Sequence, residues 1–408
     1  MKKSLLYLFC ISINSVFLMQ AIQKAIIIVP VADLIGAPVS NIKTYKRLPL
    51  CGGKINPFEA CIRMNQLLFN VIVEVLEQKN NQVKITIPHL FFTTKTNTQP
   101  YTTYWTHADN IILLDTLHEK GLNIDKIPQP FDFKKNNIEY AMRNTIVLLR
   151  PHYDKKIEYH FSAGTRFVQV NTKKNKTNYH HVYAFDKKTM AFKTLLLPKK
   201  VCLVQSKLTT HKQRTQLFVK LLRSWTHLNN GVIPYVWGGC SFIGTSNDRG
   251  FSETIHIQND KPAYSFFTKT DCTESPKTGL DCTGLIALAA QIAGIPYFLK
   301  NSTTITQHLQ QIKKDQPFEE GDIIWIDRHA MVISNIKKNL LVEARHYSHG
   351  YGIVHEIPLH KQFKQITTYK KLADAVFNKK KVSRIDKNGR IVEVLPRINI
   401  FKMASTWK

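Results

Sequence analysis

The amino-acid sequence predicts an α+β protein with several domains. Short β-type runs separated by polar turns fill the first half of the chain, and helical and strand patterns alternate in the second half. The chain has 408 residues, of which 43% are hydrophobic. At roughly 100 to 200 residues per domain, this length allows about two to four domains with their own cores. Seven cysteines are too few for a disulfide scaffold, so the fold must depend on these cores.

The first 21 residues have the pattern of a secretory signal peptide. Lys2 and Lys3 precede an apolar run from Leu5 to Met19. This run is interrupted by polar residues and is shorter than the roughly 20 apolar residues of a spanning helix, so an uncleaved anchor is the weaker alternative. We therefore expect an exported protein, in the periplasm or outside the cell, without stable membrane insertion after signal removal.

The charge balance is strongly basic. Lys and Arg number 57 against 29 Asp and Glu, which gives a formal net charge of +28. The basic residues are dispersed and form no compact arginine–aromatic stripe, and export argues against nucleic acid as a partner. The sequence favours a solvated basic surface, with attraction to anionic envelope polymers as the functional alternative. Salt would screen that attraction.

Strand and helix patterns divide the chain into six expected segments. Many short strands with turn clusters between them, such as Gln78–Asn81, predict two small β-barrels in the first half. A helix is predicted after the two barrels, with Leu217, Leu221 and Trp225 on one face. The expected segments are a signal peptide at 1–21, a first barrel at 22–125, a second barrel at 126–205, a helical connector at 206–230, a mixed α/β domain at 231–360 with an insertion at 240–280, and a basic extension at 361–408. In that extension, the run Asp386–Gly389 predicts a hairpin turn.

Cys282 is predicted to lie at the start of a helix. Apolar residues at helical spacing follow it as far as Ala293, and Gly294 and Pro296 end the pattern. Unpaired backbone amides and the positive end of the helix dipole favour a thiolate at such a position. We therefore predict an activated nucleophile, against the alternative of a buried structural cysteine.

A histidine on a strand follows this cysteine in the sequence. His329 opens the predicted strand that runs to Ser334, and the next strand carries Glu343. Papain-like thiol hydrolases present the thiolate from a helix and the base from a sheet in this way. Glu343 could orient the imidazole, but simple hairpin counting would bring His346 to it instead, so both are candidates for the third catalytic residue.

Four short strings in the second half occur in a specific order. They are Pro234–Gly239, Leu280–Leu285, Gly321–Asp322 and His329. Together they resemble the NlpC/p60 family of cell-wall cysteine peptidases over about residues 231–358, which implies a papain-like catalytic domain. The roles implied by the resemblance are nucleophile for Cys282, base for His329, third catalytic residue for Glu343, oxyanion-site shaping for Tyr235, and substrate binding for Asp281 and Thr283.

The first half resembles, more loosely, the paired bacterial SH3-like domains that precede this catalytic domain in some murein-peptide endopeptidases. The matching strings are Asp33–Leu34 and Gln66–Phe69. The two resemblances imply acyl transfer to a thiol without a cofactor, on murein (peptidoglycan) stem peptides, at the bond between γ-D-glutamyl and the diamino acid. No metal site is implied, because no CxxC or HExxH string occurs.

The SH3-like relatives also suggest how the substrate would be selected. Asp281 would bind the free amine of an N-terminal L-alanine, a role that competes with capping the helix. A first barrel packed against the cleft would then exclude intact murein. Candidates for this wall are Tyr101, Tyr104 and Trp105, which are equally compatible with a place in the barrel core.

Several features depart from the family pattern or leave alternatives open. The family usually has His, Asn or Gln where Glu343 falls, and a small residue where Met331 falls. The insertion at 240–280 is either a surface excursion or a lid. Disulfides between Cys51 and Cys61, or between Cys240 and Cys272, are compatible with export. A wall-binding protein without catalysis and an amidase or acyltransferase of the same fold are the alternative functions.

Overall fold

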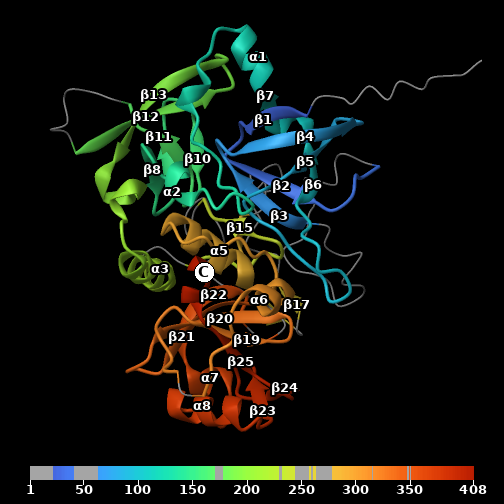
Figure 1. The fold of residues 1–408 in the computed structure, drawn as a ribbon, viewed down its shortest axis with the longest axis vertical. Helices are drawn as coiled ribbons and strands as arrows, with labels where there is room; N and C mark the ends of the chain where they lie inside the picture. The colour runs from blue at the N-terminus through green and yellow to red at the C-terminus, as the bar shows by residue number, and fades with distance from the viewer. Residues whose placement is uncertain are drawn as a thin grey trace, which may run out of the picture.

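The structure is a computed structural model that describes residues 22–40, 63–170, 178–228, 232–243, 257–258, 261–262, 278–314, 316–346, 349 and 351–408. It confirms a mixed α/β protein rich in sheets and shows three lobes (Figure 1). Two β-rich lobes lie side by side at one end of the long axis, and the third lobe forms the other end. The expected signal peptide, Cys51, Cys61, Cys272 and most of the insertion lie outside the described residues. Within the described ranges, no helix has both the length and the apolar character to cross a bilayer.

The first lobe is built on an antiparallel sheet of seven strands. The turn between β4 and β5 places Asn80 and Asn81 at φ 46° and 59°, as a tight hairpin turn of the primed type requires. In the part of the chain that the structure describes, β3 and β7 are the two edges of this sheet, so the sheet does not close into a barrel. The sheet order is β3 (Arg63–Leu68), β2 (Val31–Ile35), β6 (Thr103–His107), β5 (Gln82–Thr86), β4 (Ile72–Lys79), β1 (Gln23–Ile27) and β7 (Ile111–Leu113), and α1 (Leu114–Glu119) follows.

The second lobe shares a core with the first. Phe69, just after β3, packs its ring against Phe161 and Phe167 of the second lobe, with ring centroids 5.1 and 6.2 Å apart. Burial of these aromatic rings fixes the two lobes to each other. The elements of the second lobe are α2 (Ile138–Ala141), a sheet of β11 (Arg166–Val168), β8 (Thr145–Leu148) and β14 (Cys202–Val204), and the pairs β9 (His152–Asp154) with β10 (Tyr159–Phe161) and β12 (Tyr179–Asp186) with β13 (Ala191–Pro198).

The third lobe has a five-stranded antiparallel sheet with different partners on its two faces. Alternate residues, such as Val332 and Val342, pack in the core that contains α5 (Cys282–Ile292) and α3 (His211–Thr226). Met331, Ile333 and their neighbours on the other face pack against the C-terminal segment. The sheet order is β22 (Ile353–Pro358), β21 (Leu340–Arg345), β20 (His329–Asn335), β19 (Ile323–Ile326) and β25 (Asn399–Phe401), and α6 (Ser302–His308) lies between α5 and β19 in the sequence.

The C-terminal segment is an integral part of this lobe. β25 pairs with β19 in the central sheet, and Trp407 stacks on His211 of α3 with ring centroids 4.3 Å apart. The predicted hairpin is confirmed, because β23 pairs with β24 and Gly389 in the turn has φ 79°. The segment also contains α7 (Leu359–Gln362), α8 (Tyr369–Phe377), β23 (Val382–Ile385) and β24 (Ile391–Leu395).

Candidate active site

Cys282 is the first residue of α5, as the sequence predicts. The backbone segments before the helix pack closely together. Tyr235 forms a parallel bridge with Leu280, and β15 (Cys240–Ser241) pairs with β18 (Gly279–Leu280) just before the helix. A Cβ on Gly284 would lie 2.0 Å from the Gly239 carbonyl oxygen. The glycine in the first turn is therefore required for this approach of the two segments.

Asp281 caps α5 and pairs with a buried lysine. Its Oδ1 accepts hydrogen bonds from the backbone N–H groups of Thr283 and Gly284, at 3.0 and 2.6 Å, and from the Thr283 hydroxyl. Its Oδ2 lies 3.1 Å from Nζ of Lys300, which is 6% exposed. Of the two competing roles predicted for this carboxylate, the structure shows capping, and it shows the charge neutralised by Lys300. The Thr283 side chain, predicted to bind substrate, takes part in the same cap.

The Cys282 thiol is neutral at rest. Burial and the nearby Asp281 carboxylate raise its pKa to about 12. Hydrogen bonds from the backbone amides of Ala330 and Thr283, and the charge of Lys300, lower this pKa but do not offset the rise. The prediction of a resting thiolate at the helix start is therefore not what the structure shows. The cost of desolvating a charged sulfur by burial outweighs the stabilisation that the helix terminus gives to a thiolate.

The register of β20 and β21 decides which residue meets His329. Asn335 pairs with Leu340, and if that register continued, His329 would lie opposite His346. A bulge shifts the pairing, so that Val332 lies opposite Val342 and Glu343 shares the face of His329. As a result, Glu343 Oε2 lies 2.6 Å from His329 Nε2. Of the two candidates, the structure brings Glu343 to this nitrogen.

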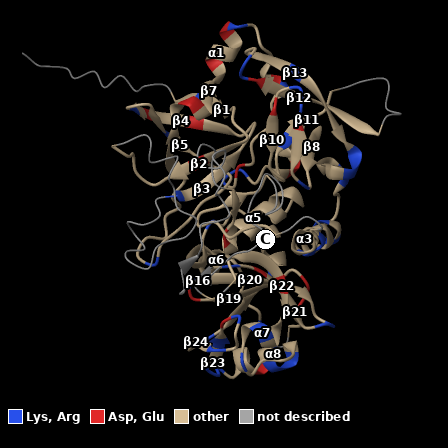
Figure 2. Cartoon of the chain, turned by 180° about the vertical axis from the view of Figure 1, so that it is seen from behind, with Lys and Arg blue, Asp and Glu red and all other residues tan. Residues whose placement is uncertain are grey.

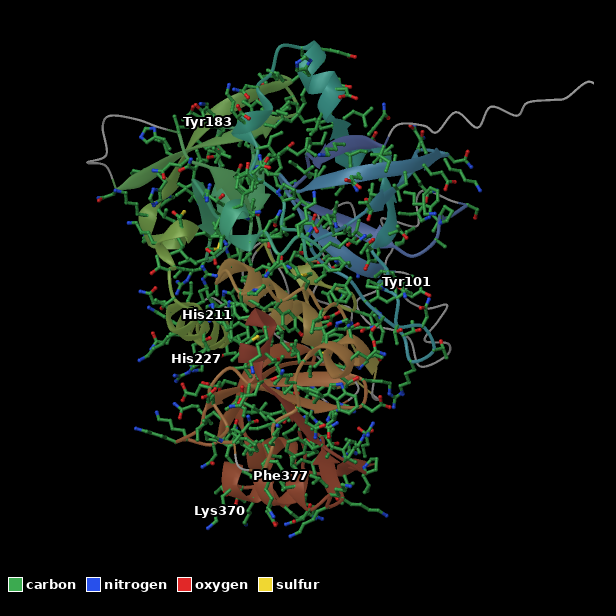
Figure 3. The ribbon with its side chains drawn as sticks, in the orientation of Figure 1. Tyr101, Tyr183, His211, His227, Lys370 and Phe377 are labelled. Carbon is green, nitrogen blue, oxygen red and sulfur yellow. The ribbon has the colours of Figure 1, made fainter. Side chains whose placement is uncertain are left out.

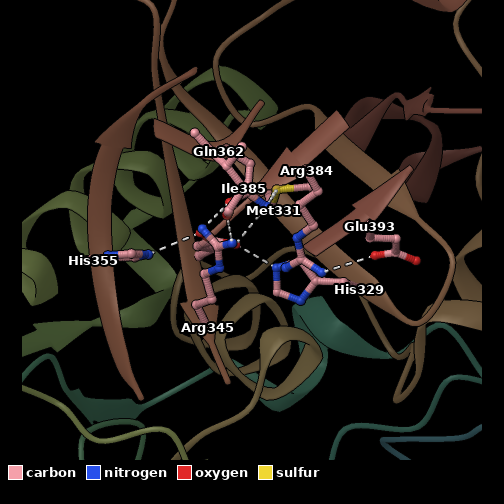
Figure 4. A network of polar contacts seen from close by, with 9 residues as sticks. His329, Met331, Arg345, His355, Gln362, Arg384, Ile385 and Glu393 are labelled. Carbon is pink, nitrogen blue, oxygen red and sulfur yellow. Dashed lines mark hydrogen bonds and ion pairs between the residues drawn. The ribbon is translucent and has the colours of Figure 1, made fainter. Parts of the chain in front are cut away.

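Glu343 is the centre of a buried polar network. Figure 4 labels its partners His329, His355, Gln362 and Arg345. Besides His329, Glu343 accepts hydrogen bonds from His355 Nε2 at 3.0 Å and from Gln362 Nε2 at 3.4 Å. Arg345 NH1 lies 3.7 Å from Glu343 Oε1. Burial opposes ionisation of Glu343, but the Arg345 charge and the two histidine hydrogen bonds hold its pKa well below the usual range. The carboxylate beside His329 is therefore ionised.

His329 is a neutral base in the resting protein. Burial and the charge of Arg384 lower its pKa to about 4, although Glu343 favours the imidazolium. Because Nε2 is engaged by Glu343, Nδ1 is the nitrogen that remains for proton transfer. A neutral imidazole can accept a proton at any pH above about 4.

Tyr235 lies beside His346 near the start of α5. Its backbone N–H donates to the Gly352 carbonyl at 2.8 Å, and its ring meets the His346 ring edge-on with centroids 5.2 Å apart. His346 has a pKa lowered to about 4, by burial first and then by the charges of His329 and Arg384. His346 is therefore close enough to His329 for their charges to interact, but the hydrogen-bond partner of His329 Nε2 is Glu343.

Four residues of the network could not be predicted from the sequence. They had no signal of their own, because charged and polar residues at irregular spacing are typical of surfaces. Met331, which departs from the family pattern, accepts a 3.2 Å contact from Gln362 Nε2 through its sulfur. The four residues are Arg345, His355, Gln362 and Arg384.

The first lobe docks on the third lobe next to the helix start. Phe91 exchanges backbone hydrogen bonds with Phe298 and Lys300, at 2.9 and 2.8 Å. The buried Arg63 pairs with Asp33 at 2.8 Å, and Gln66 connects this pair to the backbone N–H of Cys240. The strings predicted to resemble SH3-like domains therefore lie at this junction.

The three aromatic wall candidates lie in different surroundings. Tyr104 and Trp105 are 1% and 6% exposed and pack in the cores of the first lobe. Tyr101 is 38% exposed, stacks on Phe92, and lies near the outer side of that lobe (Figure 3). The segment that reaches the third lobe near Asp281 is instead the one around Phe91.

The cysteines of the described segments are free thiols. Cys202 and Cys240 are buried, and burial raises the pKa of each to about 12. A Cys240–Cys272 disulfide is therefore not formed in this structure, and both Cys51 and Cys61 lie outside the described residues. The described residues also contain no group of three or more His, Cys, Asp or Glu that could hold a metal ion.

Comparisons with known proteins bear on the fold. No protein-family model matches the sequence, and no curated protein matches it. A solved NlpC/P60 family protein from Bacillus cereus is 16% identical, with a TM-score of 0.51, over 82% of this chain and 94% of that chain. The described chain therefore has the fold of an NlpC/P60 family protein. NlpC2 and NlpC1 from Trichomonas vaginalis are both 11% identical with TM-scores of 0.31, over 84% of this chain and 95% and 90% of theirs.

Proposed function

We propose that this protein is a cysteine peptidase that hydrolyses amide bonds in murein stem peptides. The observation that carries the proposal is the 2.6 Å contact between His329 and the buried Glu343, on the strand whose next residue, Ala330, donates its amide to the Cys282 sulfur. This arrangement unites a thiol, a neutral base and an ionised carboxylate that orients the base. The NlpC/P60 fold is consistent with such a hydrolase.

In the proposed mechanism, His329 takes the thiol proton as Cys282 attacks the amide carbonyl. Glu343 stabilises the imidazolium that forms, and no separated thiolate exists beforehand. His329 then protonates the leaving amine, and a thioester joins the acyl group to Cys282. Water, deprotonated by His329, attacks the thioester and releases the acid and the free thiol.

Backbone amides at the helix start supply the oxyanion site in this proposal. The Asp281 carboxylate occupies the N–H groups of Thr283 and Gly284, which leaves the Cys282 N–H for the developing negative charge. Tyr235 borders the same region and would shape it. Hydrogen bonds that strengthen as charge develops lower the barrier for attack.

The proposed substrate class comes from the sequence resemblance. We propose cleavage between γ-D-glutamyl and the diamino acid, by an exported enzyme that acts on the cell wall. An alanine amine would reach Asp281 only by displacing the Lys300 ammonium. Recognition of a free N-terminal L-alanine is therefore not part of this proposal, and peptides with an acylated N-terminus are included among the substrates.

The two β-rich lobes would act as SH3-like domains that hold the enzyme on its substrate. Lys and Arg are spread over all three lobes, with a group around α8 and the β23–β24 hairpin (Figure 2). Such a surface would attract anionic envelope polymers, an effect that salt would weaken.

Incubation of soluble murein peptides with the full chain, followed by mass spectrometry, tests the proposal. We expect two products whose masses sum to that of the peptide plus one water, with the new carboxyl on the γ-glutamyl residue. Cys282→Ala and Cys282→Ser should each abolish turnover while circular dichroism remains unchanged. A folded wild-type protein that leaves all stem peptides intact would favour a wall-binding role instead, and cleavage at the sugar–peptide junction would favour an amidase.

A further inference from the structure

The C-terminal hairpin delivers a second buried arginine to the site. Arg384 on β23 is 5% exposed and forms a backbone bridge with Phe363. The next residue, Ile385, accepts a hydrogen bond from Arg345 through its carbonyl, and Lys387 N–H donates to His349 at 3.1 Å. These contacts fix the hairpin against the strand that carries Glu343 and against the segments that follow this strand.

The guanidinium of Arg384 is near enough to His329 for its charge to act on the imidazole. Figure 4 draws its side chain and that of His329 in the same network, and the Arg384 charge lowers the pKa of His329. Burial lowers the pKa of Arg384 to about 10, and the charges of Glu343, Arg345, Glu393 and Cys282 are near enough to influence that pKa. It therefore remains a cation at neutral pH.

This cation lacks a full set of partners. Its NH1 lies 3.7 Å from Glu393 Oε2, which is longer than a hydrogen bond, and its buried Nε has no hydrogen-bond partner. Arg345 also has a buried Nε without a partner, but its terminal nitrogens bond to Gln362 and Ile385 and pair with Glu343. Among the described residues, the ion-pair partner of Arg384 is Glu393, whose side chain is one-third exposed, whereas Arg345 pairs with the buried Glu343. A buried cation with an unfilled donor is costly unless an anion completes it.

We propose that Arg384 binds a carboxylate of the substrate beside the bond that is cleaved. A γ-glutamyl bond leaves the α-carboxylate of the same residue free, three carbon atoms from the carbonyl that Cys282 attacks. A guanidinium can hold such a group with two parallel hydrogen bonds. This inference rests on the proposed function and names Arg384 as a residue that selects γ-linked acidic peptides.

The test measures binding, so that it does not depend on turnover. The full chain carrying Cys282→Ala is titrated calorimetrically with the tripeptide L-alanyl-γ-D-glutamyl-L-lysine and with its analogue that has a carboxamide in place of the α-carboxylate. We expect the carboxylate peptide to bind roughly 10- to 100-fold more tightly, the range for a hydrogen-bonded charge. Adding Arg384→Gln should remove this preference, and affinity for the carboxamide peptide should change by less than about threefold.

Arg390→Gln is the matched control. It makes the same chemical change in the same hairpin, where Arg390 pairs with Asp386 and its side chain is 70% exposed. We expect this variant to keep the full preference. An equal loss in both variants, or a preference retained in Arg384→Gln, would overturn the proposal.

Glu393→Gln provides a test that does not require a change at the buried arginine. Removal of the competing anion should increase the carboxylate preference several-fold if Arg384 binds the substrate. An unchanged or reduced preference would count against it, even if Arg384→Gln does not fold. Failure of the proposed function has a different signature: the wild-type protein would bind the carboxylate peptide preferentially and leave it uncut.

Discussion

At the residue scale, the chemistry depends on a neutral pair. Burial gives Cys282 a pKa of about 12 and His329 a pKa of about 4, so both groups are uncharged over the range between. A thiol and an imidazole in this state react by proton transfer during the attack. The ionised Glu343 is then most useful in the transition state, where His329 becomes positive.

Alkylation of Cys282 by iodoacetamide should therefore be slow at neutral pH. Its pKa is raised from 9.0 to about 12, which makes the thiolate roughly a thousandfold rarer than in a free thiol. The rate should rise with pH across the alkaline range, because the thiolate fraction increases tenfold per pH unit. Mass spectrometry of the labelled protein, with Cys282→Ala as the control for other thiols, measures it. Rapid labelling near pH 6 would instead show a thiolate–imidazolium pair at rest.

Glu343→Gln should reduce kcat by roughly 100- to 10,000-fold, since the amide keeps the shape but does not stabilise the imidazolium. His346→Ala should have a much smaller effect, because His346 is not the hydrogen-bonded partner of His329 Nε2. Steady-state kinetics on a stem peptide compares the two variants. The opposite ranking would assign the positioning role to His346.

At the element scale, the start of α5 combines a helix cap with a buried ion pair. Asp281 and Lys300 have side chains that are 12% and 7% exposed, so each neutralises a charge that water reaches poorly. The cap also holds the first turn of the helix, and with it the position of the Cys282 sulfur. A single carboxylate thus stabilises the element that presents the nucleophile.

Asp281→Ala should lower the free energy of unfolding by about 3–5 kcal/mol, because it leaves Lys300 buried without its partner. The double variant Asp281→Ala/Lys300→Met should recover part of this loss, since it removes both charges. Urea denaturation of the single and double variants provides the comparison. A loss of only about 1 kcal/mol in Asp281→Ala, the usual value of a cap, would mean that the ion pair contributes little.

At the scale of the whole molecule, the three lobes meet around His89. This residue of the first lobe is 8% exposed, and its carbonyl accepts a 3.4 Å hydrogen bond from Gln291 of α5. It is also near enough to Arg166 of the second lobe for the arginine charge to act on its imidazole. These residues line a small apolar cavity of about 60 Å³ between the lobes. Burial, and then the Arg166 charge, lower the pKa of His89 to about 4.

The junction should therefore weaken in acid. The folded pKa of His89 lies below the unfolded value of 6.5, so the unfolded chain binds the additional proton between pH 6.5 and 4. As the pH drops through that window, protonation of His89 should lower the free energy of unfolding by about 3 kcal/mol. In His89→Gln the loss between pH 7 and pH 4, measured by urea denaturation, should be smaller by that amount. An identical loss in both proteins would exclude His89 as the source.

The sequence by itself determined the elements and the local chemistry of this protein. Helical spacing located the helix that begins at Cys282, strand patterns located His329 and Glu343, and an Asp-Lys-Asn-Gly run located the last hairpin. These features depend on short-range rules of spacing, capping and turns, which leave a record within a few residues.

Only the tertiary structure decided which groups meet and in what charge state. One β-bulge places Glu343 on the face of His329, and the C-terminal segment folds back so that the Arg384 charge acts on His329. Burial then overrides the helix terminus at Cys282, because desolvation depends on every segment packed around the sulfur. Lys300 occupies the carboxylate of Asp281 for the same reason: residues far apart in the sequence share one buried site, and no local pattern reports such a contact.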